Sequence, residues 1–225
     1  MSFNPSKCEV IHITIHTNKI HQSTLQSVKS GKYLGVSFAN NPSWNIHTQS
    51  TIKKANNSLS FLRRNITSCP KDIKAQSYKT LVRPTLKYAG TVWDPHTATN
   101  INQLEAVQRR AARFVKGDYS TTSSTTAMTA DLGWPTLQHR RSNAKLMMVY
   151  TITHNLIAIP AAQYIHPLAL GGHGYGYRFY VPFCRIDTKK FSFVPSAIRL
   201  WKQLPEHLAP AVGLDAFKGG LVMAP

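Results

Sequence analysis

The chain changes its hydrophobic pattern at about residue 40. Before that point apolar and polar residues alternate, and the segment 8–17, CEVIHITIHT, is rich in β-branched residues and predicts a strand. The segment 32–38, KYLGVSF, predicts a second strand, and the polar residues between the two allow an antiparallel pairing. From about residue 43 the apolar residues recur at helical spacing. The pattern predicts a mainly α-helical chain that begins with a β-hairpin.

The first predicted helix has two contrasting faces. The apolar residues fall on one side and predict the buried face: Ile52, Ala55, Leu59, Leu62 and Ile66. The residues on the opposite side are polar or basic: Lys53, Asn57, Ser60 and Arg64. This second set predicts a face that contacts solvent or a partner.

The segment 104–120, LEAVQRRAARFVKGDYS, predicts another amphipathic helix. Its buried stripe is formed by four apolar residues: Leu104, Val107, Ala111 and Phe114. Arg109, Arg113 and Lys116 are expected to share an exposed face, whereas Arg110 lies nearer the apolar stripe. Asn100 and Gln103 have the spacing of a capping box at the start of this helix, and Gly117 is a suitable end.

The basic residues of this helix have one carboxylate, Glu105, as a possible partner within it. Like charges on one helix face repel each other by a few tenths of a kcal/mol per pair. We therefore expect negative charge from outside the helix. Phosphate groups of a nucleic acid are the leading source, and distant acidic residues of the same chain are the alternative.

The C-terminal half predicts further helices separated by prolines and loops. Pro84 should kink or restart the helix before it, and Pro135 should open a long helix that runs to about Asn155, with Arg140 and Arg141 near its start. Two short helices are predicted at 195–205 and 214–221. The polar run STTSSTT marks a candidate boundary, which gives three regions: 1–40, 41–119 and 120–225.

Net charge narrows the class of partner. The 225 residues contain 27 Lys and Arg against 9 Asp and Glu, for a formal net charge of +18. The charge is spread through periodic segments, so it belongs to a folded body whose expected partner is a polyanion, RNA or DNA. An anionic membrane surface is the alternative. No apolar run approaches the roughly 18 residues of a spanning helix, and we expect no membrane association.

The cysteines bear on the compartment. Cys8, Cys69 and Cys184 are odd in number and widely spaced, which disfavours a disulfide framework. We expect an intracellular, reducing compartment, either the nucleus or a cytoplasmic nucleoprotein.

Seven segments occur in an order that carries a family resemblance. They are NPSKCEV (4–10), KYLGV (32–36), LSFLRRN (59–65), YKTLVRPTLKYAGTVWDPH (78–96), LEAVQRRAARFVKGDY (104–119), LGWPTLQHRR (132–141) and SFVPSAIRLWKQLP (192–205). Together they resemble the C-terminal part of the reverse transcriptase of a non-LTR (LINE-type) retrotransposon.

The resemblance implies a role for each region. Residues 1–40 match the end of the palm, where Lys7 corresponds to a palm lysine, and Tyr33, Leu34 and Gly35 match the hairpin that forms the primer grip. Residues 41–119 match the thumb, which follows the template–primer duplex, and the resemblance assigns no role to 120–225. Lys87 departs from the pattern, since the family favours an acidic residue there.

The resemblance also implies that catalysis lies elsewhere. Two-metal phosphoryl transfer needs at least two converging carboxylates. No two of the 9 acidic residues are neighbours, and the matching catalytic motif would precede residue 1. No counterpart of the family's endonuclease is found either. We expect no polymerase activity from this chain alone and no cofactor or metal, because Mg²⁺ would belong to the parent polymerase.

These observations predict a fragment that binds template–primer RNA or DNA. The expected nucleic-acid-binding residues are basic: Lys53, Arg64, Arg109, Arg110, Arg113, Lys116, Arg140 and Arg141. Two alternatives remain open. In the first, the chain is a polymerase part that needs the missing palm in trans. In the second, it is a degenerate transposon-derived fragment with no retained activity.

Overall fold

The computed structural model describes residues 9–11, 19–20, 23–24, 26–41, 43–168, 178–205 and 207–223. Lys7 and most of the predicted strand at 8–17 lie outside these residues. The chain forms two compact units: unit 1 comprises Met1–Ala89 and Pro95–Leu132, and unit 2 comprises Gly90–Asp94 and Gly133–Pro225. Among the described helices, none is both long and apolar enough to cross a membrane.

Unit 1 begins with short strands. β5 (Ser30–Tyr33) and β6 (Val36–Ala39) form an antiparallel hairpin whose two-residue turn is Leu34 and Gly35. The prediction of one strand over 32–38 is therefore wrong, because the chain reverses in the middle of that segment. Both turn residues have positive φ, 45° and 82°, as the tightest hairpin turns require.

The other strands of unit 1 are two residues long. β1 (Glu9–Val10) pairs in parallel with β4 (Gln26–Ser27), and β2 (Lys19–Ile20) pairs antiparallel with β3 (Ser23–Thr24). Glu9–Val10, the part of 8–17 that is described in a strand, pairs with β4 and not with 32–38, contrary to the expected pairing.

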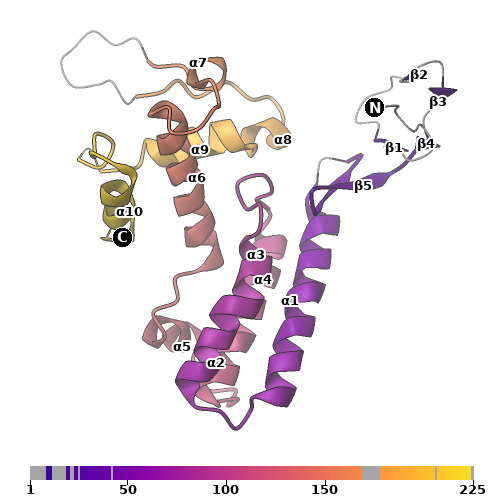
Figure 1. Ribbon diagram of the computed structural model, residues 1–225, viewed down its shortest axis with the longest axis vertical. Coiled ribbons are helices and arrows are strands. Elements are labelled where there is room, and N and C mark those ends of the chain that lie inside the picture. The colour runs from indigo at the N-terminus through magenta and orange to yellow at the C-terminus, as the bar shows by residue number, and fades with distance from the viewer. Residues whose placement is uncertain are drawn as a thin grey trace. The chain divides into compact units, whose positions relative to one another are not determined.

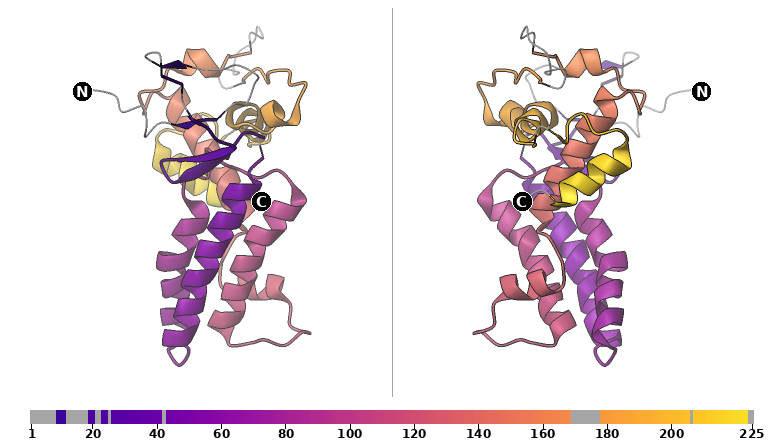
Figure 2. Two further views of the ribbon diagram at one scale, coloured as in Figure 1. Left: turned by 90° about the vertical axis from the view of Figure 1, so that its right-hand side faces the viewer. Right: turned by 90° about the vertical axis from the view of Figure 1, so that its left-hand side faces the viewer.

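The body of unit 1 is helical. Its helices are α1 (Asn45–Asn65), α2 (Lys71–Ser77), the π-helical segment η2 (Tyr78–Val82), α3 (Arg83–Lys87), α4 (Ala98–Lys116) and α5 (Thr125–Asp131). The views in Figures 1 and 2 show α1 and α4 side by side, in agreement with their contacts. α5 packs against α4, so unit 1 extends past the predicted boundary at 120–126.

The predicted apolar faces build the core of unit 1. Ala55, Leu59 and Leu62 of α1 are buried, and so is the whole predicted stripe of α4. The break expected at Pro84 takes the form of η2, where the Arg83 amide donates to the Tyr78 carbonyl. A π-helical turn of this kind accommodates a proline that has no amide hydrogen to donate.

Polar side chains also join α1 to α4. Asn100 Nδ2 donates to Asn45 Oδ1 at 2.7 Å, and Gln49 Nε2 donates to Gln103 Oε1 at 2.6 Å. The predicted capping box is therefore wrong: α4 already begins at Ala98, and both of its proposed members contact α1 instead. Gly117 ends the helix as predicted, with a φ of 69°.

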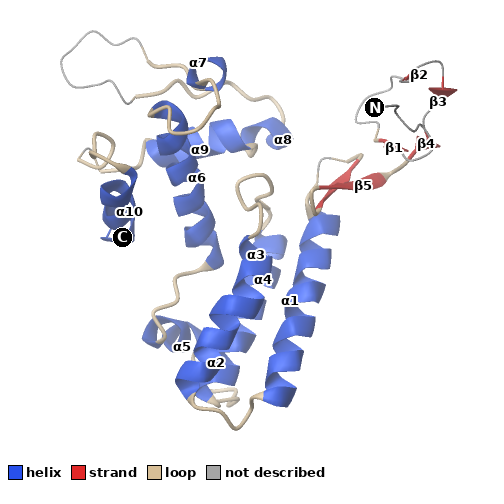
Figure 3. Cartoon of the chain, viewed as in Figure 1, coloured by secondary structure: helices blue, strands red, loops and turns tan. Residues whose placement is uncertain are grey.

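Unit 2 contains α6 (Leu137–Thr153), α7 (Ala161–Tyr164), α8 (Asp187–Lys190), α9 (Phe193–Trp201) and α10 (Leu214–Met223). The last two correspond to the predicted short helices, and α6 to the long one. Its core stacks three rings: Phe217 lies 4.4 Å from Tyr150 and 5.7 Å from Trp201, centroid to centroid. Figure 3 shows helices as the main element of the chain, which confirms the predicted mainly α fold with an N-terminal hairpin.

Candidate nucleic-acid interface

The basic side chains of α4 find partners inside unit 1. Arg109 Nη2 donates to the Asn102 carbonyl at 3.3 Å, and Arg113 Nη1 donates to the Ser120 carbonyl at 2.6 Å. Lys116 Nζ lies 3.1 Å from a carboxylate oxygen of Asp131 on α5. All three side chains are partly buried. The expectation of a shared exposed face on α4 is therefore wrong: Arg109 bonds back to its own helix, and the following loop and α5 supply the partners of Arg113 and Lys116.

Arg110 behaves differently from its neighbours. It is exposed rather than packed near the apolar stripe, and its Nη2 donates to Asn56 Oδ1 of α1 at 3.0 Å. Partial burial and the nearby charge of Arg109 lower the pKa of Arg110. Because Asn56 is neutral, the positive charge of Arg110 is not compensated by this contact.

One exposed basic surface of unit 1 lies on α1. Its cations Lys53, Lys54, Arg63 and Arg64 are all exposed, and the helix contains no acidic residue. The predicted polar face of α1 is thus confirmed as exposed, and we call it the α1 stripe: Lys53, Asn57, Ser60 and Arg64. At a rise of 1.5 Å per residue, the stripe is about 16 Å long.

A pocket lies at the C-terminal end of the α1 stripe. Its volume is about 450 Å³, and we call it the Tyr119 pocket after its aromatic member; it is lined by Ser60, Arg63, Arg64, Thr67 and Tyr119. The Arg63 guanidinium carbon lies 5.3 Å from the centre of the Tyr119 ring, in cation–π geometry. The pocket therefore combines planar stacking surfaces with donors for an anion.

The loop that carries Tyr119 is held by its own hydrogen bonds. Besides the bond from Arg113, the Ser120 amide donates to Asp118 Oδ1 at 2.9 Å, and the Ser120 and Thr122 hydroxyl oxygens lie 2.8 Å apart. Hydrogen bonds from Ser123 and Ser120 and the charge of Arg113 lower the pKa of Asp118. Its carboxylate stays ionised at neutral pH and keeps accepting these bonds.

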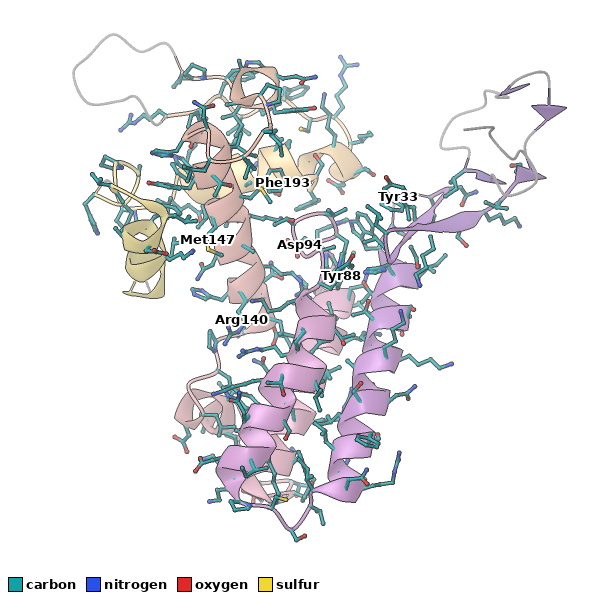
Figure 4. All side chains as sticks on the ribbon, viewed as in Figure 1. Tyr33, Tyr88, Asp94, Arg140, Met147 and Phe193 are labelled. Atoms are coloured by element: carbon teal, nitrogen blue, oxygen red, sulfur yellow. The ribbon has the colours of Figure 1, made fainter. Side chains whose placement is uncertain are left out.

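The hairpin tip exposes its side chains while its backbone contacts Tyr88. Tyr33 and Leu34 are 69% and 72% exposed, and the Tyr88 hydroxyl donates to the Leu34 carbonyl at 2.8 Å (Figure 4). A Cβ on Gly35 would lie 3.2 Å from the Tyr88 ring, so this position favours glycine by both space and φ. A leucine with positive φ is uncommon and costs about 1–2 kcal/mol.

The hairpin is anchored to the start of α1. The Ser37 amide donates to His47 Nδ1 at 3.1 Å, and Phe38 meets Trp44 edge-on at 5.8 Å. His47 is buried; desolvation, followed by the charges of Lys54 and Lys32, lowers its pKa. The imidazole is therefore neutral and accepts the Ser37 hydrogen bond.

The predicted site residues of unit 2 do not form a basic surface. Arg141 is 3% exposed, its guanidinium carbon lies 5.1 Å from the Trp93 ring centre, and its Nε lies 3.8 Å from Asp94 Oδ1. Lys145 Nζ contacts Asp94 Oδ2 at 2.7 Å. Arg141 is thus part of a buried ionic cluster, which corrects its assignment to nucleic-acid binding. Arg140, near the start of α6 in Figure 4, is partly buried.

Three residues of the candidate interface were not predicted as binding residues. Lys54 and Arg63 lie beside the polar face that the helical pattern identified, so a wider arc on the helical wheel would have included them. Tyr119 has no comparable signal, because its position depends on how the loop after α4 folds. Within the described residues, no group of three or more His, Cys, Asp or Glu side chains is placed to hold a metal ion.

The chain matches no family model, no curated protein and no solved structure. The resemblance to non-LTR reverse transcriptases therefore stays a prediction carried by the seven sequence segments.

Proposed function

We propose that unit 1 binds a nucleic-acid duplex along α1, as the thumb of a reverse transcriptase binds its template–primer. The observation that carries this proposal is the charge of α1: four exposed cations and no acidic residue on a helix of 21 residues. Self-repulsion on such a face is relieved when phosphates lie against it.

The α1 stripe suits contacts with the phosphate backbone. One strand of a duplex carries a phosphate about every 3.4 Å along the axis, so a 16 Å stripe spans roughly five of them. An ammonium, an amide, a hydroxyl and a guanidinium group follow one another along the stripe, and each can donate hydrogen bonds to phosphate oxygens. Such contacts position a duplex without reading its sequence.

The hairpin tip is the second part of unit 1 that we propose to contact nucleic acid. On the resemblance, Tyr33, Leu34 and Gly35 contact the primer end, and the exposure of the first two leaves their side chains accessible. The unfavourable φ of Leu34 is the kind of backbone strain that clusters at functional sites. The same tip supports the runner-up function, a polymerase part that acts with a catalytic palm supplied in trans.

Binding as a function of salt tests the proposal. Each neutralised phosphate contributes about 0.9 to the slope of log K against log salt, so the two cations of the α1 stripe predict a slope of about −2, which steepens to about −4 where Lys54 and Arg63 on its flanks also reach phosphates. RNA–DNA hybrids of two unrelated sequences should bind alike in fluorescence anisotropy. No binding, or a slope near zero, contradicts the proposal and leaves the degenerate fragment as the better description.

Primer extension separates the proposed function from the runner-up. We expect the chain alone to extend no primer with Mg²⁺ and deoxynucleotides. Extension that appears on addition of a separately purified catalytic palm supports the runner-up, whereas extension by the repurified chain alone contradicts both.

A further inference from the structure

We propose that the Tyr119 pocket holds an unpaired nucleotide at the edge of the duplex, with its phosphate on Arg64 and its base on the Arg63–Tyr119 stack. This inference rests on the proposed function, because the α1 stripe delivers the strand to the pocket. Ser60 and Arg64 belong to both the stripe and the pocket, so a strand that follows the stripe reaches the pocket directly.

The phosphate side of the pocket is formed by donors. Two guanidinium groups and the hydroxyls of Ser60 and Thr67 line it, and no carboxylate is among its lining residues. Arg64 is exposed and makes no hydrogen bond or ion pair with any described part of the chain. A guanidinium with unused donors binds phosphate oxygens in bidentate geometry.

The base side of the pocket is formed by planar groups. The Arg63 guanidinium rests on the Tyr119 ring, and both offer a surface on which a base can stack. Paired bases are already stacked on their neighbours, whereas an unpaired base has a free face. The pocket therefore favours a single-stranded nucleotide over a base pair, and any base satisfies it.

The pocket is pre-organised for such a ligand. Arg113 and Asp118 both bond to Ser120, so the loop on which Tyr119 lies is ordered before anything binds. Binding then costs little additional ordering of the loop. Arg113 is, in this view, a positioning residue that acts on nucleic acid through Tyr119. The volume of about 450 Å³ falls in the range of small-ligand sites, about 300–1,000 Å³.

The experiment compares three labelled duplexes that share one paired region. The first is blunt, the second carries a short thymidine overhang, and the third carries an overhang of the same length made of abasic nucleotides. Stacking of one base contributes about 1–3 kcal/mol, so the thymidine overhang should bind roughly 5- to 150-fold more tightly than the abasic one. Fluorescence anisotropy at fixed salt measures the ratio.

Substitutions of Tyr119 assign the effect to the pocket. Tyr119→Ala should reduce the preference for thymidine over abasic nucleotides several-fold, because Arg63 alone is left as a stacking surface, and Tyr119→Phe, the matched control, should retain it because the ring remains. Tyr119 is 53% exposed, so neither substitution should unfold unit 1. The readout is the ratio of thymidine to abasic binding within each variant, so any effect of Tyr119 on duplex binding in general cancels from it.

Two results overturn the inference while leaving the proposed function in place: equal binding of the thymidine and abasic overhangs, or a preference that Tyr119→Ala leaves undiminished. Failure of the blunt duplex to bind contradicts the α1 proposal instead. If the thymidine overhang still binds in that case, and binding depends on Tyr119, the pocket is a single-strand site on its own.

Discussion

Replacing Leu34 by Asn should stabilise the hairpin of unit 1. Leu34 has a φ of 45°, a left-handed conformation that costs an ordinary residue about 1–2 kcal/mol and that Asn tolerates far better. Asn followed by Gly is also the preferred pair in a two-residue hairpin turn. The side chain is already 72% exposed, so the lost burial costs only about 0.5 kcal/mol. The net gain should be about 0.5–1 kcal/mol.

Amide hydrogen exchange across β5 and β6 measures this gain as a higher free energy of local opening. The bond from Tyr88 to the residue 34 carbonyl should persist, since it involves the backbone. Gly35→Ala serves as a control of opposite sign: with a φ of 82° and a Cβ 3.2 Å from Tyr88, it should destabilise the hairpin by about 1–2 kcal/mol. Faster exchange in Leu34→Asn than in the unmodified chain would show that the φ of Leu34 carries no strain that Asn relieves.

Three further substitutions test other contacts. Arg113→Gln should speed amide exchange in the loop that carries Tyr119. It should also lower the free energy of unfolding of unit 1, measured by urea titration, by about 1 kcal/mol, because a charge-assisted hydrogen bond is lost. Because folding lowers the pKa of His47, the unfolded chain binds a proton at a pH where the folded chain does not. The free energy of unfolding should therefore fall as pH drops below 6.5, by at most about 1.4 kcal/mol per pH unit. His47→Gln should remove that part of the dependence in urea titrations. Asp94→Asn should destabilise unit 2 in urea by about 3 kcal/mol, because it leaves buried Lys145 without its counter-charge; an unchanged midpoint would contradict the buried cluster.

The helices could be predicted because helical spacing is a local property of the sequence. Ala55, Leu59 and Leu62 of α1 are buried as predicted, and Lys53 and Arg64 are exposed on the other side. The hydrophobic pattern alone does not predict the hairpin turn, because Leu-Gly lacks the Asn or Asp that usually marks such a turn, whereas the family resemblance implies a hairpin there. Leu34 adopts its φ with the support of a tertiary contact from Tyr88, which no local pattern reveals.

The candidate site could be predicted only in part, and for a related reason. A helical wheel places Arg109, Arg113 and Lys116 together, but it does not show what covers them. Arg109 and Arg113 donate to neutral backbone carbonyls, and Lys116 pairs with the carboxylate of Asp131, so all three partners are supplied by unit 1 itself. The basic surface is instead found on α1, where Arg64 makes no hydrogen bond or ion pair with the described residues.

The most direct test of the α1 interface compares two double substitutions that remove the same charge. Lys53→Gln with Arg64→Gln should flatten the slope of log K against log salt by about 2 on any hybrid sequence, while the melting temperature stays nearly unchanged. Arg109→Gln with Arg113→Gln should lower the melting temperature and leave the slope almost as it was. If the second pair flattens the slope and the first does not, nucleic acid binds α4 and the account given for α1 is wrong.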